Sequence, residues 1–364
     1  MKKLIFIAAA AVAMAACSQS SIVTDNLPIS FAPNALSTKA LILPDSDSPE
    51  QLAFPTSESF NVYAFADLDG TGTAYSTNYT TPLMDDVNIS YQSGDWKATA
   101  GTYLWPVTGT VDFYAYYPQS LNAQFISDEN PKGIKFTDVE LGNTIGSQID
   151  PLMASVMSQV AASRPKVSLV FKHLTSQIAV TAVDATSTAS LQGKISIKSV
   201  VFKNMKIKGD YRDGTTTGKG EWTNISTLND FTSFSGSEVL ETTPSYLSGG
   251  AFSAAIDNSS AFVVIPEDIL NGTAEDQVID VTYSIAAYSI NGFDYPATGN
   301  MTVSIPLYGK VSANKFQNGK RYIFHIGISL DGANNEIMFS PLVEGWETEN
   351  IDGITIDAVN AALL

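Results

Sequence analysis

Apolar side chains recur at every second position along many short stretches of this 364-residue chain. Successive side chains of an extended strand point to opposite faces, so a period of two predicts strands with one face buried. Glycine-containing turn sequences such as 67–70 and 211–214 separate the stretches. The sequence therefore predicts an all-β protein built from β-sandwiches. The clearest alternating stretches are 111–117, 167–171, 178–180, 279–285, 301–305 and 322–328.

One segment, 150–163, departs from this period. Leu152, Val156 and Val160 stand at helical spacing, which fits either a short helix or an apolar loop. The length of the chain suggests two domains. We place the boundary in the short connection after Phe171, which gives domains of 40–172 and 173–364.

The N-terminus has the pattern of a secretory signal over residues 1–16, with Lys2 and Lys3 before an apolar run and small residues before Cys17. The run is shorter than the roughly 20 residues that span a bilayer. The sequence before Cys17 resembles a lipobox, in which the cysteine thiol receives a diacylglyceryl group. The alternative is an ordinary signal peptide followed by an unrelated cysteine. Cys17 is the only cysteine, so no disulfide can form within the chain.

The formal charge of −17 and the presence of only two histidines limit the classes of function that the chain can have. Such acidity repels phosphate, so we expect no nucleic-acid partner. His173 and His325 lie in strand patterns outside any catalytic or metal-binding motif. The acid pairs Asp85-Asp86 and Asp45-Asp47 lack the remainder of a calcium loop. We therefore expect no enzyme activity, no metal and no cofactor.

Several segments indicate a protein family more specifically by their order and spacing together than any one of them does alone. They resemble, in this order and behind a lipobox, the Bacteroidales fimbrillins, which are subunits of the fimbriae called type V pili. The resemblance implies two tandem β-sandwich domains, the second transthyretin-like, and a structural role in adhesion. The segments are ISF at 29–31, STKA at 37–40, FNVYAF at 60–65, YLWP at 103–106, VDFYAYYP at 111–118, 167–173, FVVIP at 262–266, NGKRY at 318–322 and IMF at 337–339, with Val343 and Trp346.

The resemblance also implies a maturation step. Fimbrillins travel to the outer membrane as lipoproteins, and an extracellular trypsin-like protease then removes an N-terminal segment. Between Lys3 and Lys97 the only basic residue is Lys39, which precedes Ala40 and stands where the family usually has arginine. We expect cleavage after Lys39, with 17–39 as the propeptide. The alternative is that Lys39 is an ordinary solvated loop lysine.

Two ends of the chain have the alternation that strand exchange requires. Leu27, Ile29 and Phe31 alternate with polar or small residues, so this segment is expected to fill a groove of the first domain until cleavage displaces it. The tail 350–364 is the candidate donor strand that would replace it in a neighbouring subunit. The alternatives are that the tail is an internal strand of the second domain or an end without fixed structure. The donor side chains would be Ile354, Ile356, Ala358, Val359 and Leu363.

The sequence thus favours a stalk subunit of a fimbria, anchored in the outer membrane by lipid until cleavage and extracellular afterwards. Its partners would be copies of itself, other fimbrial subunits and the protease, with a host glycan or protein as a further candidate. Two alternatives remain. One is a fimbrial anchor that retains its lipid, and the other is a monomeric glycan-binding lipoprotein in which Tyr114 and Tyr116 stack on sugars.

Overall fold

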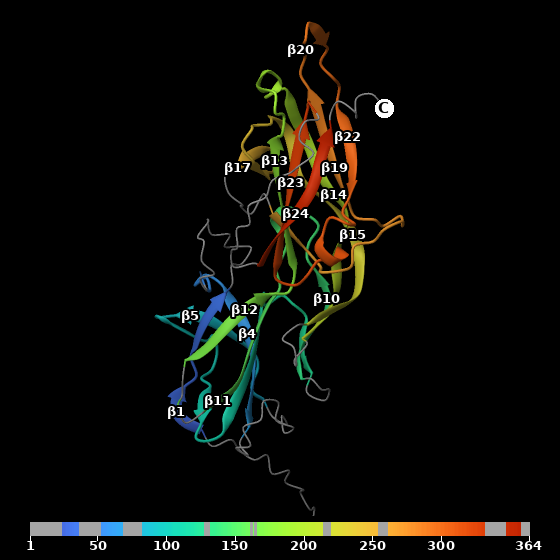
Figure 1. Cartoon of the computed structure of the whole chain (residues 1–364). Helices are drawn as coiled ribbons and strands as arrows, with labels where there is room; N and C mark the ends of the chain where they lie inside the picture. Colours follow the sequence, from blue (N-terminus) through green and yellow to red (C-terminus); the bar gives the residue numbers. More distant parts are fainter. Residues whose placement is uncertain are drawn as a thin grey trace, which may run out of the picture.

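A computed structural model describes residues 24–35, 52–67, 82–126, 132–160, 163, 166–213, 220–253, 261–331 and 347–357. These residues form β-strands and three short 3-10 turns, and none of them lies in an α-helix. Figure 1 shows the strands arranged in several sheets along an elongated molecule. Within the described residues there is no helix with the length and apolarity needed to cross a membrane. The predicted all-β class is confirmed.

The first large sheet has eight strands in the order β12-β11-β8-β4-β5-β6-β2-β3. Because β12 also pairs with β2, the sheet closes on itself as a ring. Aromatic side chains fill its interior, where Phe54, Phe60 and Phe171 contact one another at ring-centroid distances of 5.1 to 5.5 Å. The strands are β2 Phe31–Ala35, β3 Leu52–Ala53, β4 Ser59–Asp67, β5 Pro82–Gln92, β6 Asp95–Ala98, β8 Thr110–Tyr117, β11 Leu152–Val160 and β12 Val167–His173.

Two further sheets face each other across a second core. Phe202 on β14 packs against Phe262 on β18 and Phe324 on β23, with ring centroids 5.2 and 5.3 Å apart, so the two sheets form a sandwich. One sheet contains β9 Ala123–Ile126, β10 Gly133–Glu140, β14 Ile195–Arg212, β15 Glu221–Val239, β19 Val278–Ile285 and β22 Met301–Pro306. The other contains β13 Ser176–Asp184, β16 Ser245–Ser248, β17 Ala251–Ser253, β18 Ala261–Val264, β23 Lys320–Ser329 and β24 Glu347–Asp357.

Two small sheets complete the fold. β1 Thr24–Pro28 pairs with β7 Leu104–Pro106, and β20 Tyr288–Ile290 pairs with β21 Phe293–Tyr295. The 3-10 turns are Ile145–Ser147, Ala189–Leu191 and Ser312–Asn314.

Every stretch that the period of two marked clearly is a strand, namely β8, β12, β13, β19, β22 and β23. β19 follows the pattern strictly, with Ile279, Val281, Tyr283 and Ile285 buried and the residues between them half-buried. β12 and β19 thus have one face in a core, whereas β8, β13 and β23 are buried on both faces.

The helix-or-loop interpretation of 150–163 is wrong, because residues 152–160 form strand β11 between β8 and β12. The register of β11 against β8 shifts between Val156 and Gln159, where Ser158 has a φ of 54°. A spacing of four residues is also an even number, so Leu152 and Val156 share one face of a strand as readily as one face of a helix. Val160 is exposed rather than on a buried face.

The expected division at residue 172 stays a prediction. Strands β9 and β10 precede that position, yet β10 pairs with β14 in the sandwich. The outer face of the first sheet also packs against these strands, since the ring centroid of Tyr114 lies 4.8 Å from that of Phe125. The outer face of the ring and the sandwich therefore share one continuous hydrophobic core.

Candidate functional site

The segment that the sequence predicts to be displaced contributes one strand, β2, to the closed ring. β2 lies between β12, to which it is parallel, and β6, to which it is antiparallel, and in Figure 1 it belongs to the part of the molecule that holds β12 and β4. Phe31 is opposite Val167, whose N–H donates a hydrogen bond to the Ser30 carbonyl oxygen at 2.9 Å. Phe54 N–H donates to the Pro33 carbonyl oxygen at 3.3 Å. β2 thus occupies a slot between two sheet edges.

The side chains of this segment enter the ring core at alternate positions. Ile29, Phe31 and Pro33 are buried, and Phe31 is only 2 % exposed. Its ring makes edge contacts with Phe60 at 6.0 Å and with Phe113 at 5.8 Å. This geometry is the favourable arrangement for two aromatic rings.

Leu27 does not belong to this inward series. It lies in β1 and is 49 % exposed. The chain turns inward at the next residues, where Ile29 N–H donates to the Tyr103 carbonyl oxygen at 2.8 Å. The alternation expected from Leu27 therefore begins at Ile29.

The candidate donor strand is described from Glu347 to Asp357 as β24. It is the outermost strand of its sheet and runs parallel to β23, with Ile354 opposite Ile326 and Ile356 opposite Ile328. Its only strand partner among the described residues is β23. The described part of the tail is thus paired along one edge only.

Several residues singled out in the sequence lie outside the described part of the chain. Lipidation and cleavage therefore stay predictions. These residues are Cys17, Lys39, Ala40, Ala358, Val359 and Leu363.

The two histidines are strand residues with structural hydrogen bonds. His173 Nδ1 lies 2.7 Å from Asp150 Oδ2, and Thr175 Oγ1 donates to Asp150 Oδ1 at 2.8 Å, all three residues being buried. His325 Nδ1 lies 2.6 Å from Thr181 Oγ1, which joins β23 to its neighbour β13. Neither arrangement is a Ser-His-Asp geometry.

The acidic pair at 85–86 serves the fold in a similar way. Asp86 Oδ1 accepts hydrogen bonds from Asn61 Nδ2 at 2.9 Å and from Tyr116 OH at 2.6 Å. Burial, followed by the hydrogen bond to Asp86, raises the pKa of the Tyr116 phenol, so this residue remains a donor at physiological pH. Among the described residues, no group of three or more His, Cys, Asp or Glu could hold a metal ion.

Tyr114 and Tyr116 are not exposed, which corrects the suggestion that they stack on sugars. They are 0 % and 1 % exposed, and their rings pack against Phe125 and Phe136 of β9 and β10. The strands β9 and β10 therefore cover the face that a glycan would need.

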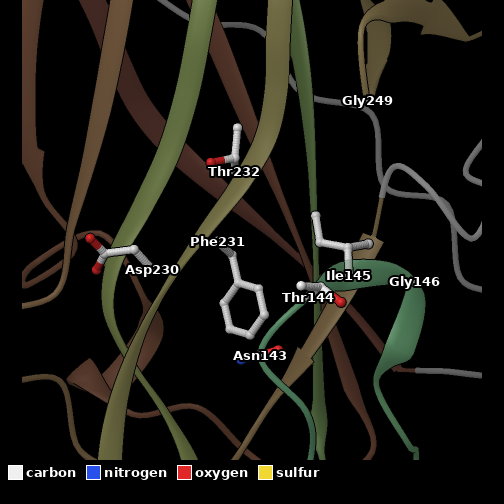
Figure 2. Close-up of a pocket in the computed structure, with 8 residues that line it drawn as sticks. All are labelled: Asn143, Thr144, Ile145, Gly146, Asp230, Phe231, Thr232 and Gly249. Atoms are coloured by element: carbon white, nitrogen blue, oxygen red, sulfur yellow. The ribbon is translucent and has the colours of Figure 1, made fainter.

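A hollow of about 570 Å³ lies beside the 3-10 turn Ile145–Ser147. Figure 2 shows its two sides, one formed by this turn and the other by β15. Its one carboxylate, Asp230, accepts a hydrogen bond from Asn204 N–H at 3.1 Å. No sequence motif marked the hollow, and it contains no pair of groups for acid–base chemistry. The lining residues are Asn143, Thr144, Ile145, Gly146, Asp230, Phe231, Thr232 and Gly249.

The sequence profile of a family described as fimbrillin-like matches residues 29–346, most of the chain. The chain belongs to the fimbrillin-like family. Members of this family are cell-surface structural proteins and not enzymes. The match begins at Ile29, where the inward side chains of the N-terminal segment also begin.

Matches among solved structures include proteins from Bacteroides species. A fimbrial protein from Bacteroides vulgatus has 15% sequence identity and a TM-score of 0.49, over 84% of this chain and 96% of its own. A candidate cell adhesion protein from Bacteroides uniformis has 16% identity and a TM-score of 0.45, over 83% and 93%. A candidate cell adhesion protein from Bacteroides ovatus has 16% identity and a TM-score of 0.45, over 83% of this chain and 92% of its own. Since these TM-scores are below 0.5, the family assignment of this fimbrillin-like protein rests on the sequence match. No curated protein matches.

Proposed function

We propose that this fimbrillin-like protein is a stalk subunit of a surface fimbria that polymerises by β-strand exchange. In this scheme it is exported as a lipoprotein on Cys17, and a trypsin-like protease then cuts after Lys39. The observation that carries the proposal is the position of β2, the strand that closes the first sheet between β12 and β6.

Loss of the propeptide would open this ring. Backbone groups of Val167 to Phe171 that now pair with β2 would lose their partners, and an unpaired edge of this kind attracts another strand. The three buried side chains of the segment contribute roughly 1.5 to 3 kcal/mol each, or about 4.5 to 9 kcal/mol together, before ordering costs. A replacement strand with similar side chains would recover this burial.

The C-terminal tail has the properties of such a replacement. Ile354, Ile356 and Ala358 repeat the alternate spacing of the buried residues in the N-terminal segment. In strand addition, backbone hydrogen bonds supply affinity and alternate side chains supply specificity. β24 pairs with β23 alone among the described strands, so its release breaks one ladder rather than two.

Cleavage would also release the subunit from the membrane. Two or more acyl chains anchor a protein stably, so the lipidated precursor would remain attached. Because Lys39 follows both Cys17 and β2 in the chain, one cut removes the anchor and the displaced strand together.

The test is electron microscopy of the purified precursor before and after limited trypsin treatment. Filaments are expected only after treatment, and Lys39→Gln is expected to prevent both cleavage and growth. Mass spectrometry of native fibres should find Ala40 at the N-terminus. Lipidated Cys17 on every fibre subunit would refute the stalk role and point to an anchor.

A further inference from the structure

The hairpin formed by β20 and β21 projects from the sandwich as a two-stranded sheet of its own. Its turn is Asn291-Gly292, with φ values of 53° and 80°. A two-residue turn with positive φ at both positions matches the twist of the flanking strands, and Asn-Gly is its preferred sequence. The hairpin conformation is therefore set locally by the sequence.

One face of this hairpin is apolar. In the register, Tyr288 is opposite Tyr295 and Ile290 is opposite Phe293, so these four side chains share a face. The rings of Tyr288 and Tyr295 stack at 4.8 Å with an angle of 9° between their planes. Phe293 is 69 % exposed and Tyr295 44 % exposed. We call these four residues the aromatic face.

The opposite face is polar, since Ser289 donates a hydrogen bond to the Asp294 carboxylate there. A two-stranded hairpin alone is marginally stable in water, and clustered exposed apolar side chains mark interaction sites. Tyr288 and Ile290 pack partly against the core, and Phe293 and Tyr295 remain exposed.

The hairpin stands at the end of the sandwich where the C-terminal tail departs. β24 ends at Asp357 together with β23, and β13 ends beside them at Asp184. The Asp184 carboxylate accepts a hydrogen bond from Gly193 N–H at 2.8 Å. The next carbonyl, that of Lys194, accepts one from Ala286 N–H at 2.8 Å, two residues before the hairpin. Asp357, the last described residue of the tail, therefore lies at the end that carries the aromatic face.

The slot that holds β2 opens at the opposite end of the molecule. Figure 1 places β20 at one end and β1 and β11 at the other. The pairing of β2 with β12 begins at Phe31 and Val167, and Val167 follows closely after Val160, the last residue of β11. Val160 is 52 % exposed, and Val107 in the nearby turn between β7 and β8 is 42 % exposed.

These positions determine which partner fits the aromatic face. We propose that it docks on a second copy of this chain, against the end that carries Val107 and Val160. The inference rests on the proposed function, because a tail that leaves beside the hairpin and enters the slot of the next subunit brings these two ends together. The incoming strand would run parallel to β12, in the direction that β2 has now. A head-to-tail contact between two different surfaces produces an open filament.

Disulfide trapping tests the contact directly. Cys17 is the only cysteine and is lost with the propeptide, so introduced thiols are unique in the cleaved protein. The double variant Tyr295→Cys with Val160→Cys is expected to give a ladder of covalent oligomers after trypsin treatment and mild oxidation. Each single variant is expected to give no species beyond a dimer. Filaments of the double variant without a ladder would overturn the contact.

A matched pair of substitutions gives the energetic test. Phe293→Ser should raise the critical concentration for filament growth at least tenfold, whereas Ser289→Ala on the polar face should leave it unchanged. Both monomers should keep their thermal midpoint, because neither side chain is buried. Normal growth of Phe293→Ser would overturn the docking role. Absence of filaments from the unsubstituted cleaved protein would overturn both proposals.

Discussion

The substitution Phe31→Ala tests whether β2 is part of the precursor fold and leaves with the propeptide. Phe31 is buried in the ring core, and Phe→Ala changes at buried positions cost about 3 to 5 kcal/mol. Part of this loss comes from its two edge-to-face contacts, with Phe60 and Phe113, at roughly 0.5 to 1.5 kcal/mol each. We expect the uncleaved protein to lose about 3 to 4 kcal/mol of unfolding free energy.

The assay is urea unfolding of the precursor followed by tryptophan fluorescence, with Trp96 and Trp105 reporting on the ring core. Hydrogen exchange of β12 provides a second, local measure, since β12 pairs directly with β2. Leu27→Ala is the matched control. It lies in the same N-terminal segment but is half exposed, so its effect should be below about 0.5 kcal/mol.

Cleavage supplies the decisive comparison. After trypsin has removed the segment up to Lys39, the cleaved Phe31→Ala and wild-type products have the same sequence and must behave identically if the segment has dissociated. A loss in the precursor equal to that of Leu27→Ala would refute the burial argument. A difference that persists after cleavage would show that the segment stays bound.

Three further predictions concern processing, donation and pH. Trypsin should cleave Lys39→Arg as it cleaves the native site, and Lys39→Gln should stay intact. Mass spectrometry measures both outcomes. Cleavage of the Gln variant at the same bond would exclude Lys39 as the target. Deletion from Ile354 onward should leave a folded, cleavable monomer that forms no fibres, and normal fibres from it would exclude the tail as donor. Burial raises the pKa of Glu267 to about 7 from its ordinary value of 4.5, although Gln277 donates a hydrogen bond to the carboxylate. Because the pKa of Glu267 is higher in the folded than in the unfolded protein, ionisation of this carboxyl lowers the unfolding free energy. The loss is absent below about pH 4.5 and complete above about pH 7. Glu267→Gln should therefore raise the unfolding free energy by on the order of 2 kcal/mol at pH 8 and hardly at pH 4, and an equal effect at both values would contradict this assignment.

The strands with one buried face were the most predictable part of the fold. β19 and β12 follow the period of two because alternate residues enter a core. The sequence also predicts β8 from its alternating pattern, but both faces of β8 are buried. The pattern does not show that Tyr114 and Tyr116 lie under β9 and β10. Exposure is a property of the neighbours that cover a strand, so a single strand's sequence cannot determine it.

The candidate site was predictable in part for the same reason. Ile29 and Phe31 were identified by alternation, whereas Leu27 shares the alternation and is exposed, because the chain changes partner from β7 to β12 between them. The predictions made from the sequence do not include the hairpin, although Asn291-Gly292 between alternating apolar residues is a strong local signal for one.

The sequence by itself determined the clearly alternating strands and the family, and it predicted the segments that would exchange, because period, turn chemistry and spacing are local properties of the chain. The tertiary structure alone decided that β2 closes a ring against β12, since this parallel pair joins segments far apart in the chain. It also decided that the end of β24 and the aromatic hairpin lie at one end while the slot that holds β2 lies at the other. Strand pairing depends on which edges meet after the sheets have packed, and that information is distributed over the whole molecule.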